Sequence, residues 1–185
     1  MAERDTTGRQ VVKYTFYKLD RTFLRLPEEK QRDAKLDFID TVRGFNRRML
    51  LRSYSLVGMR RDVDFLLWTV AEEAEAFQGL ETAIRSTALG PYLDVPRSFL
   101  SATKRSLYDI SLPEDSRKPN AEERIRIEPS GSRYLFVYPF IKARPWYALS
   151  QDDRQRMITE HIRIGRNYPD IRLNTTYSYG IDDQE

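Results

Sequence analysis

His161 is the only histidine of this 185-residue chain, and the chain contains no cysteine. A neutral imidazole can coordinate a haem iron without a second protein ligand. A zinc site, by contrast, needs three or four His, Cys or carboxylate ligands at short spacings. If His161 binds a metal, the sequence therefore indicates haem iron and not zinc. The commoner alternative is a core histidine whose ring nitrogens bond backbone groups or water.

The helix expected to carry His161 runs from residue 151 to residue 164. Ser150 and Asp153 form a Ser-x-x-Asp capping pair at its start, which contributes roughly 1 kcal/mol. Gly165 is expected to end the helix in the left-handed conformation. The spacing of apolar residues places His161 on the apolar face of the helix. The other residues of that face are Met157, Ile158 and Ile162.

A strand is predicted before this helix, from Tyr134 to Lys142, because aromatic and β-branched residues dominate the segment and Pro145 ends it. Tyr138 lies in its middle. An aromatic side chain on a strand usually packs, and a lysine is usually solvated. Residue type alone therefore assigns no chemistry to Tyr138 or Lys142.

The motifs of the second half of the chain, taken together, resemble the chlorite dismutase-like haem protein family. In order, they are YP-x-x-K at 138–142, WY-x-L at 146–149, Arg154, Glu160-His161, Gly165, Tyr168 and YSYGIDD at 177–183. Within the family the chain is most similar to the coproheme decarboxylases, peroxide-dependent enzymes that finish haem synthesis in many bacteria. The resemblance is close over residues 126–185 and looser before them.

This resemblance implies a function and a set of site residues. Iron-coproporphyrin III (coproheme) would bind with His161 as its proximal iron ligand, and hydrogen peroxide would drive its oxidative decarboxylation to haem b. Tyr138 matches the tyrosine that forms the catalytic radical. Lys142 and Arg126 match cofactor-binding cations, with Arg124 as the other candidate for the arginine. Charge-assisted donors suit a ligand that carries several propionates.

The family also contains chlorite dismutases and haem-binding peroxidase-like proteins, and these are the alternative functions. Chlorite dismutases place an arginine on the strand after the ligand helix, where many decarboxylases have a glutamine. The matching position is Leu173 when counted back from Gly180, and Asn174 when counted forward from His161. Strand alternation points the adjacent Arg172 away from the face of Leu173. An apolar residue there would argue against chlorite decomposition.

The elements that must position these residues predict an α+β protein. The first half has the order βαββαβ, which is the ferredoxin-like plan. The helix that opens at Pro27 is expected to bury Leu36, Phe38, Ile39, Val42 and Phe45. Strands are expected at 11–19, 49–57, 62–70 and 99–110, and a second helix at 71–89. Gly44 and Asn46 are expected to close the first helix.

An internal repeat supports this plan. Leu26-Pro27 precedes Tyr54 by the same distance as Leu149-Ser150 precedes Tyr177, since 54 − 26 = 28 and 177 − 149 = 28. Position 161 then corresponds to Phe38, because 161 − 123 = 38. The second copy therefore has an imidazole where the first copy has a phenyl ring.

The repeat predicts two ferredoxin-like βαββαβ units that form a dimeric α/β-barrel-type domain. The N-terminal repeat spans 1–111, a connecting loop spans 112–132, and the C-terminal haem-binding repeat spans 133–185. The second repeat stops where its next strand is expected, so we expect a C-terminal truncation. The family resemblance implies a homo-oligomer, commonly a pentamer.

Composition points to a cytoplasmic protein that does not bind a membrane. The N-terminus lacks an apolar signal region, and no apolar run approaches the roughly 20 residues of a membrane span. Net charge is +3 and a cluster of arginines lies between residues 43 and 61, so nucleic-acid binding is an alternative of a different class. Acidic residues interrupt that cluster, and we expect no nucleic-acid partner. A family member that has lost its haem and serves as a structural barrel is a further alternative.

Overall fold

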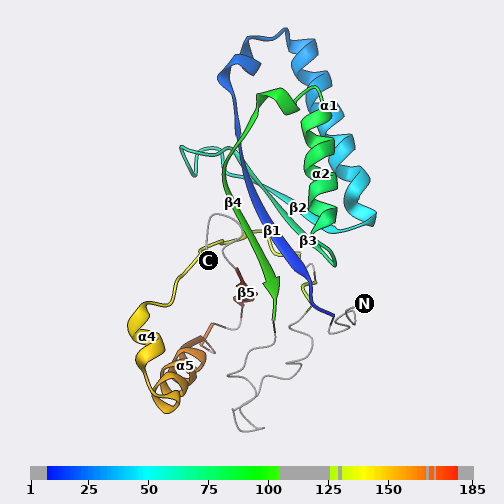
Figure 1. Ribbon diagram of the computed structural model, residues 1–185. Helices are drawn as coiled ribbons and strands as arrows, with labels where there is room; N and C mark the ends of the chain where they lie inside the picture. The colour runs from blue at the N-terminus through cyan, green and yellow to red at the C-terminus, as the bar shows by residue number, and fades with distance from the viewer. Residues whose placement is uncertain (1–7, 105–125, 129–130, 166, 169, 179–185) are drawn as a thin grey trace.

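A five-stranded antiparallel sheet organises the computed structural model, which describes residues 8–104, 126–128, 131–165, 167–168 and 170–178. The strands lie in the order β2-β3-β1-β4-β5. Helices α1 (Glu28–Gly44) and α2 (Glu75–Ser86) lie together on one face of it (Figure 1). The strands are β1 (Val11–Leu19), β2 (Leu50–Ser55), β3 (Phe65–Ala71), β4 (Leu93–Thr103) and β5 (Thr176–Tyr177). Three short 3-10 segments complete this part: η1 (Arg21–Arg25), η2 (Phe45–Arg47) and η3 (Gly90–Tyr92).

Two further helices, α4 (Arg144–Ala148) and α5 (Gln151–Gly165), lie away from α1 and α2 (Figure 1). The chain then returns to the sheet as β5, which pairs with the end of β4. Ser101 Oγ lies 2.8 Å from Thr176 Oγ1, and Ser178 Oγ donates to the Leu100 carbonyl at 2.9 Å. These bonds attach the second half of the chain to the first. No helix of the described part is both long and apolar enough to span a membrane.

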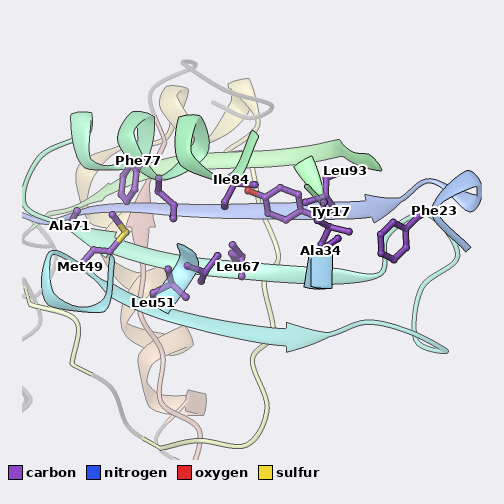
Figure 2. Packing of buried hydrophobic residues seen from close by; sticks show 13 residues of the cluster. Tyr17, Phe23, Ala34, Met49, Leu51, Leu67, Ala71, Phe77, Ile84 and Leu93 are labelled. Carbon is purple, nitrogen blue, oxygen red and sulfur yellow. The ribbon is translucent and has the colours of Figure 1, made fainter. Parts of the chain in front are cut away.

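Each face of the sheet carries its own apolar core, because side chains of a strand alternate between the two faces. The helix-side core, between the sheet and helices α1 and α2, is shown in Figure 2. Its buried members are Tyr17, Phe23, Ala34, Val42, Met49, Leu51, Leu67, Ala71, Phe77, Leu80, Ile84, Leu89 and Leu93. The open-face core, on the other side, consists of Val12, Tyr14, Phe16, Val63, Leu66, Trp68, Val70 and Ile127.

Tyr17 shows how the helix-side core accommodates a polar group. Its ring stacks on Phe65 with centroids 4.9 Å apart, and its hydroxyl donates to Glu81 Oε2 at 2.7 Å. Arg85 pairs with the same carboxylate at 2.7 Å. Burial and the neighbouring Glu81 raise the pKa of Tyr17 far above its ordinary value. The tyrosine therefore stays neutral, and its buried hydroxyl is satisfied.

The βαββαβ order predicted for the first half is what the structure shows over β1 to β4. Several boundaries differ. Residues 71–74 do not belong to α2, since β3 extends to Ala71 and the helix begins at Glu75. β4 begins at Leu93, not at Phe99, because the chain leaves η3 directly into the ladder with β1. The end predicted for this strand, 105–110, lies outside the described residues.

The buried face predicted for α1 is partly wrong. Ala34 and Val42 are buried, and Phe38 packs at the edge of the helix-side core. Leu36 and Ile39, in contrast, are exposed. The prediction gave α1 a wider apolar stripe than the contact with α2 and the sheet requires.

The strand predicted from Tyr134 to Lys142 is also absent, because no ladder pairs this segment with a described strand. From Tyr134 to Tyr138 its side chains nevertheless alternate between exposed and half-buried. Leu135 and Val137 pack against the open-face core, whereas Tyr138 is 66% exposed. The period-two pattern is therefore real, but the hydrogen-bonded partner that defines a strand is missing from the described part.

Replacing Ile84 tests this core assignment. Ile84 is fully buried, so Ile84→Ala is expected to lower the free energy of unfolding by about 2–5 kcal/mol. Leu36→Ala on α1 is the control, because a half-exposed side chain contributes less than about 0.5 kcal/mol. Urea unfolding followed by circular dichroism measures both. A larger loss at Leu36 than at Ile84 would contradict the assignment.

Candidate functional site

The start of α5 is built as predicted. The backbone N–H of Asp153 donates to Ser150 Oγ at 3.1 Å, and the Ser150 hydroxyl donates to Asp153 Oδ2 at 2.6 Å. This bond, with help from the Arg156 guanidinium, lowers the pKa of the Asp153 carboxyl below its ordinary value. Gly165 ends the helix, but the left-handed conformation predicted for it is wrong, since it does not have a positive φ. The predicted cap at the start of α5 is therefore confirmed, whereas the predicted cap at its end is not.

His161 lies in the C-terminal half of α5, and its side chain is exposed. No residue of α5 is buried in the described fold. The apolar face predicted for this helix is present in sequence, but Met157 on it is 53% exposed. His161 is consequently not a core histidine in the part of the chain that the structure describes, and its imidazole is accessible to a ligand.

Tyr138 is held on the outward side of the segment that precedes α4. Leu135 and Val137 anchor the segment on the open-face core, and alternation then directs Tyr138 away from it. The Tyr138 and Phe140 rings lie 6.4 Å apart on that outward side. The exposed aromatics of this side are Tyr134, Phe136, Tyr138 and Phe140.

Lys142 is positioned by an aromatic ring. Its Nζ lies 5.3 Å from the centroid of the half-buried Trp146 ring, a cation–π contact between the end of the extended segment and α4. The WY-x-L motif therefore has a structural role: its tryptophan supports the lysine of the YP-x-x-K motif.

Arg126 is placed beside the first half of the chain. Its guanidinium pairs with Glu72 at 2.8 Å, and both side chains are more than half exposed. The next residue, Ile127, is buried, and its N–H donates to Gln10 Oε1 at 2.6 Å. The structure thus fixes the backbone at Arg126 but pairs its charge with Glu72. Arg124 lies outside the described residues.

The described residues contain no cluster of three His, Cys, Asp or Glu side chains suited to a metal ion. Among the predicted site residues, Lys142 contacts the Trp146 ring and Tyr138 lies beside the Phe140 ring. Arg126 forms an ion pair with Glu72. Sequence reasoning gave no role to Arg154, whose Nε is shut off from solvent and has no hydrogen-bond partner in the described part. The repeat offset of 123 relates Arg154 to Gln31, whose amide donates to the carbonyls of Leu24 and Leu26.

That offset recurs in the positions of the elements. η1 spans Arg21–Arg25 and α4 spans Arg144–Ala148, with 144 − 21 = 123 and 148 − 25 = 123. α1 begins at Glu28 and α5 at Gln151, again with 151 − 28 = 123.

Backbone hydrogen bonds around these helix starts repeat with the same offset. Phe23 N–H donates to the Asp20 carbonyl at 3.1 Å, and Trp146 N–H donates to the Ala143 carbonyl at 2.9 Å. Gln31 N–H bonds the Pro27 carbonyl at 3.0 Å, and Arg154 N–H bonds the Ser150 carbonyl at 3.1 Å. The two segments therefore repeat these hydrogen bonds, although η1 is a 3-10 segment and α4 is an α-helix.

The fold and these residues describe an α+β protein whose single histidine lies on a capped helix that follows an aromatic segment in the chain. The chlorite dismutase family profile matches residues 31–185, and the chain belongs to this family. Coproheme decarboxylase from Mycolicibacterium smegmatis is 33% identical over 133 residues, which cover 71% of this chain and 54% of that protein. Coproheme decarboxylase from Staphylococcus carnosus is 30% identical over 139 residues, covering 71% and 55%. The chain spans about half the length of these curated relatives.

Solved structures agree on the fold. A mutant chlorite dismutase from Candidatus Nitrospira defluvii superposes with a TM-score of 0.79 at 22% identity, over 95% of this chain and 73% of that one. A haem-binding protein from Thermus thermophilus gives a TM-score of 0.72 at 22% identity, over 86% and 67%. At these identities the likeness extends to the fold alone.

Proposed function

We propose that this chain is part of an enzyme that converts iron-coproporphyrin III to haem b by hydrogen peroxide-dependent oxidative decarboxylation. The names of the two curated relatives and the ordered motifs of the second half support this proposal. In it, His161 is the proximal iron ligand, Tyr138 is the radical site, and Lys142 and Arg126 meet propionates. A cytoplasmic homo-oligomer, commonly a pentamer in the family, is part of the same proposal.

The observation that carries the proposal is the position of His161 in the repeated arrangement. Its counterpart Phe38, at 161 − 123 = 38, lies on α1 and packs edge-on against Phe65 at 5.8 Å, between helix and sheet. In the second unit the same helix position carries an imidazole. An iron porphyrin would then occupy the layer that apolar side chains occupy in the first unit. This interpretation rests on two ferredoxin-like repeats, 1–111 and 133–185, joined by 112–132.

The residues present suit such a group. His161 is an accessible single ligand, and the apolar side chains beside it on α5 are left exposed or half-exposed by the described fold. Lys142 and Arg126 supply positive charge for carboxylates. A bound iron porphyrin supplies oxidising power when peroxide reaches it. Tyr138 Oη would give up its hydrogen atom to the peroxide-derived oxidant and then take a hydrogen atom from a propionate side chain. Loss of a second electron to the same oxidant would release carbon dioxide and leave a vinyl group, so that each decarboxylation would consume one hydrogen peroxide, reduced to water.

The offset also supports one choice of distal residue. Asn174 corresponds to Leu51, since 174 − 123 = 51, and Leu51 is buried in the helix-side core. Leu173 corresponds to Leu50, which packs on the open-face core. We therefore propose that Asn174, and not Leu173, faces the layer that contains His161.

The same register keeps chlorite dismutation as the second candidate function. Arg172 corresponds to Met49, since 172 − 123 = 49, and Met49 also lies in the helix-side core. Arg172 would thus share the face of Asn174 and could offer a cation to an oxyanion. An oxygen-electrode assay with chlorite separates this activity from decarboxylation.

Tyr138→Phe tests the proposed chemistry. The protein is loaded with iron-coproporphyrin III, treated with hydrogen peroxide and analysed by mass spectrometry. The parent is expected to lose about 46 Da twice, since each propionate gives up carbon dioxide and two hydrogens when it becomes a vinyl group, whereas Tyr138→Phe binds the porphyrin but loses none, because it has no phenolic hydrogen to give up. Tyr134→Phe removes the same hydroxyl four residues earlier and is expected to behave like the parent. Retention of all four propionates by the parent would refute the proposed function.

Asn174→Leu tests the distal assignment. Cyanide binding to the ferric, porphyrin-loaded protein is expected to weaken about tenfold, because one hydrogen-bond donor to the iron-bound anion is lost. Leu173→Ala should leave the affinity unchanged. Titrations followed by absorption measure both, and an effect of Leu173→Ala without an effect of Asn174→Leu would contradict the register.

A further inference from the structure

Gln10 and Glu72 lie opposite one another at one end of the sheet. The antiparallel ladder of β1 and β3 ends with Val11 paired to Ala71, and one further step of the same register reaches these two residues. Gln10 is buried, whereas Glu72 is exposed. Side chains at directly opposite positions share a face of the sheet, so these two reach the same neighbouring segment.

That segment is the one that contains Arg126. Gln10 Oε1 accepts the N–H of the buried Ile127 at 2.6 Å, and this bond holds the backbone in place. Glu72 Oε1 accepts a hydrogen bond from Arg126 Nη2 at 2.8 Å. Because the two contacts fall on consecutive residues, the arginine stays within reach of Glu72 even when its side chain is released.

The ion pair of Arg126 and Glu72 is open to competition. It consists of a single hydrogen bond, and the two side chains are 56% and 57% exposed. Ion pairs of this kind are weak, because water and salt screen the two charges. A ligand carboxylate is the same kind of acceptor as the Glu72 carboxylate, so it can replace Glu72 at the guanidinium.

We propose that Glu72 is an internal competitor of the ligand: its carboxylate occupies Arg126 in the empty protein and gives way to a ligand carboxylate, here a porphyrin propionate. The identification of that carboxylate as a propionate rests on the proposed function. Glu72 acts through Arg126 and lowers the affinity for the porphyrin, because the guanidinium must leave one carboxylate before it binds the other. Removal of the Glu72 charge therefore strengthens binding.

Titrations of the full chain with metal-free coproporphyrin III test this, with porphyrin fluorescence as the signal. This ring has the carboxylates of the proposed substrate but no iron, so its binding reports on the carboxylate contacts without an iron ligand. Glu72→Gln is expected to bind it about threefold more tightly, since an exposed ion pair of ordinary strength is removed. Glu73→Gln removes the same charge from the next residue, which is also exposed, and should leave the affinity unchanged. The titrations are repeated with ferric coproporphyrin III and followed by absorption.

Arg126→Leu determines whether the effect passes through the arginine. Alone it should weaken binding about tenfold, because a charge-assisted donor is lost. In this background Glu72→Gln should give no gain, since the competition has been removed. A gain that persists without Arg126 would overturn the inference, because the Glu72 charge would then act on the porphyrin directly. Equal or weaker binding by Glu72→Gln in the presence of Arg126 would overturn it as well.

Decarboxylation by the iron-loaded parent is measured alongside these affinities. Release of carbon dioxide without tighter binding by Glu72→Gln would overturn the competition by Glu72 alone. Tighter binding by Glu72→Gln without decarboxylation by the parent would refute the proposed function alone. A parent that binds neither the metal-free nor the ferric ring would overturn both.

Discussion

The side chains of β1 alternate between two cores, and this alternation determines on which face of the sheet the segment around Tyr138 packs. Odd positions such as Tyr17 enter the helix-side core, and even positions such as Val12 and Tyr14 enter the open-face core. Leu135 and Val137 join the open-face core from the second half of the chain. Because Leu135 and Val137 pack there, Tyr138 faces the opposite way, since one step along an extended chain reverses the side chain.

The helices α1 and α5 occupy matching positions in the chain but differ in how much of their surface is buried. Between α1 and the sheet, large apolar side chains fill the space, as buried interiors require. The matching helix α5 buries no residue in the described fold, although its start repeats the hydrogen bonds of α1 with a constant offset. A packed layer in one unit and an exposed one in the other are explained together if the second layer receives a porphyrin. His161 in place of Phe38 is one chemical difference between the two helices.

Much of the fold could be predicted from sequence, because period-two and period-3.6 patterns report directly on burial. Local patterns of this kind predicted β1, the start of α1, the capping pair of α5 and the repeat spacing. What failed depended on neighbours: Leu36 and Ile39 look apolar but remain exposed, and 134–142 looks like a strand but has no ladder in the described part. The pairing of Arg126 with Glu72 joins residues 54 positions apart, and no local pattern encodes such a contact.

Iron binding in the proposed site depends on His161. The most direct measurement is the absorption spectrum of the His161→Ala variant after addition of ferric coproporphyrin III, compared with that of the parent and repeated with added imidazole. We predict that the Soret band of the bound form disappears in the variant and returns when imidazole fills the space. A variant that binds the porphyrin with the spectrum of the parent would contradict the assignment of His161 as the iron ligand.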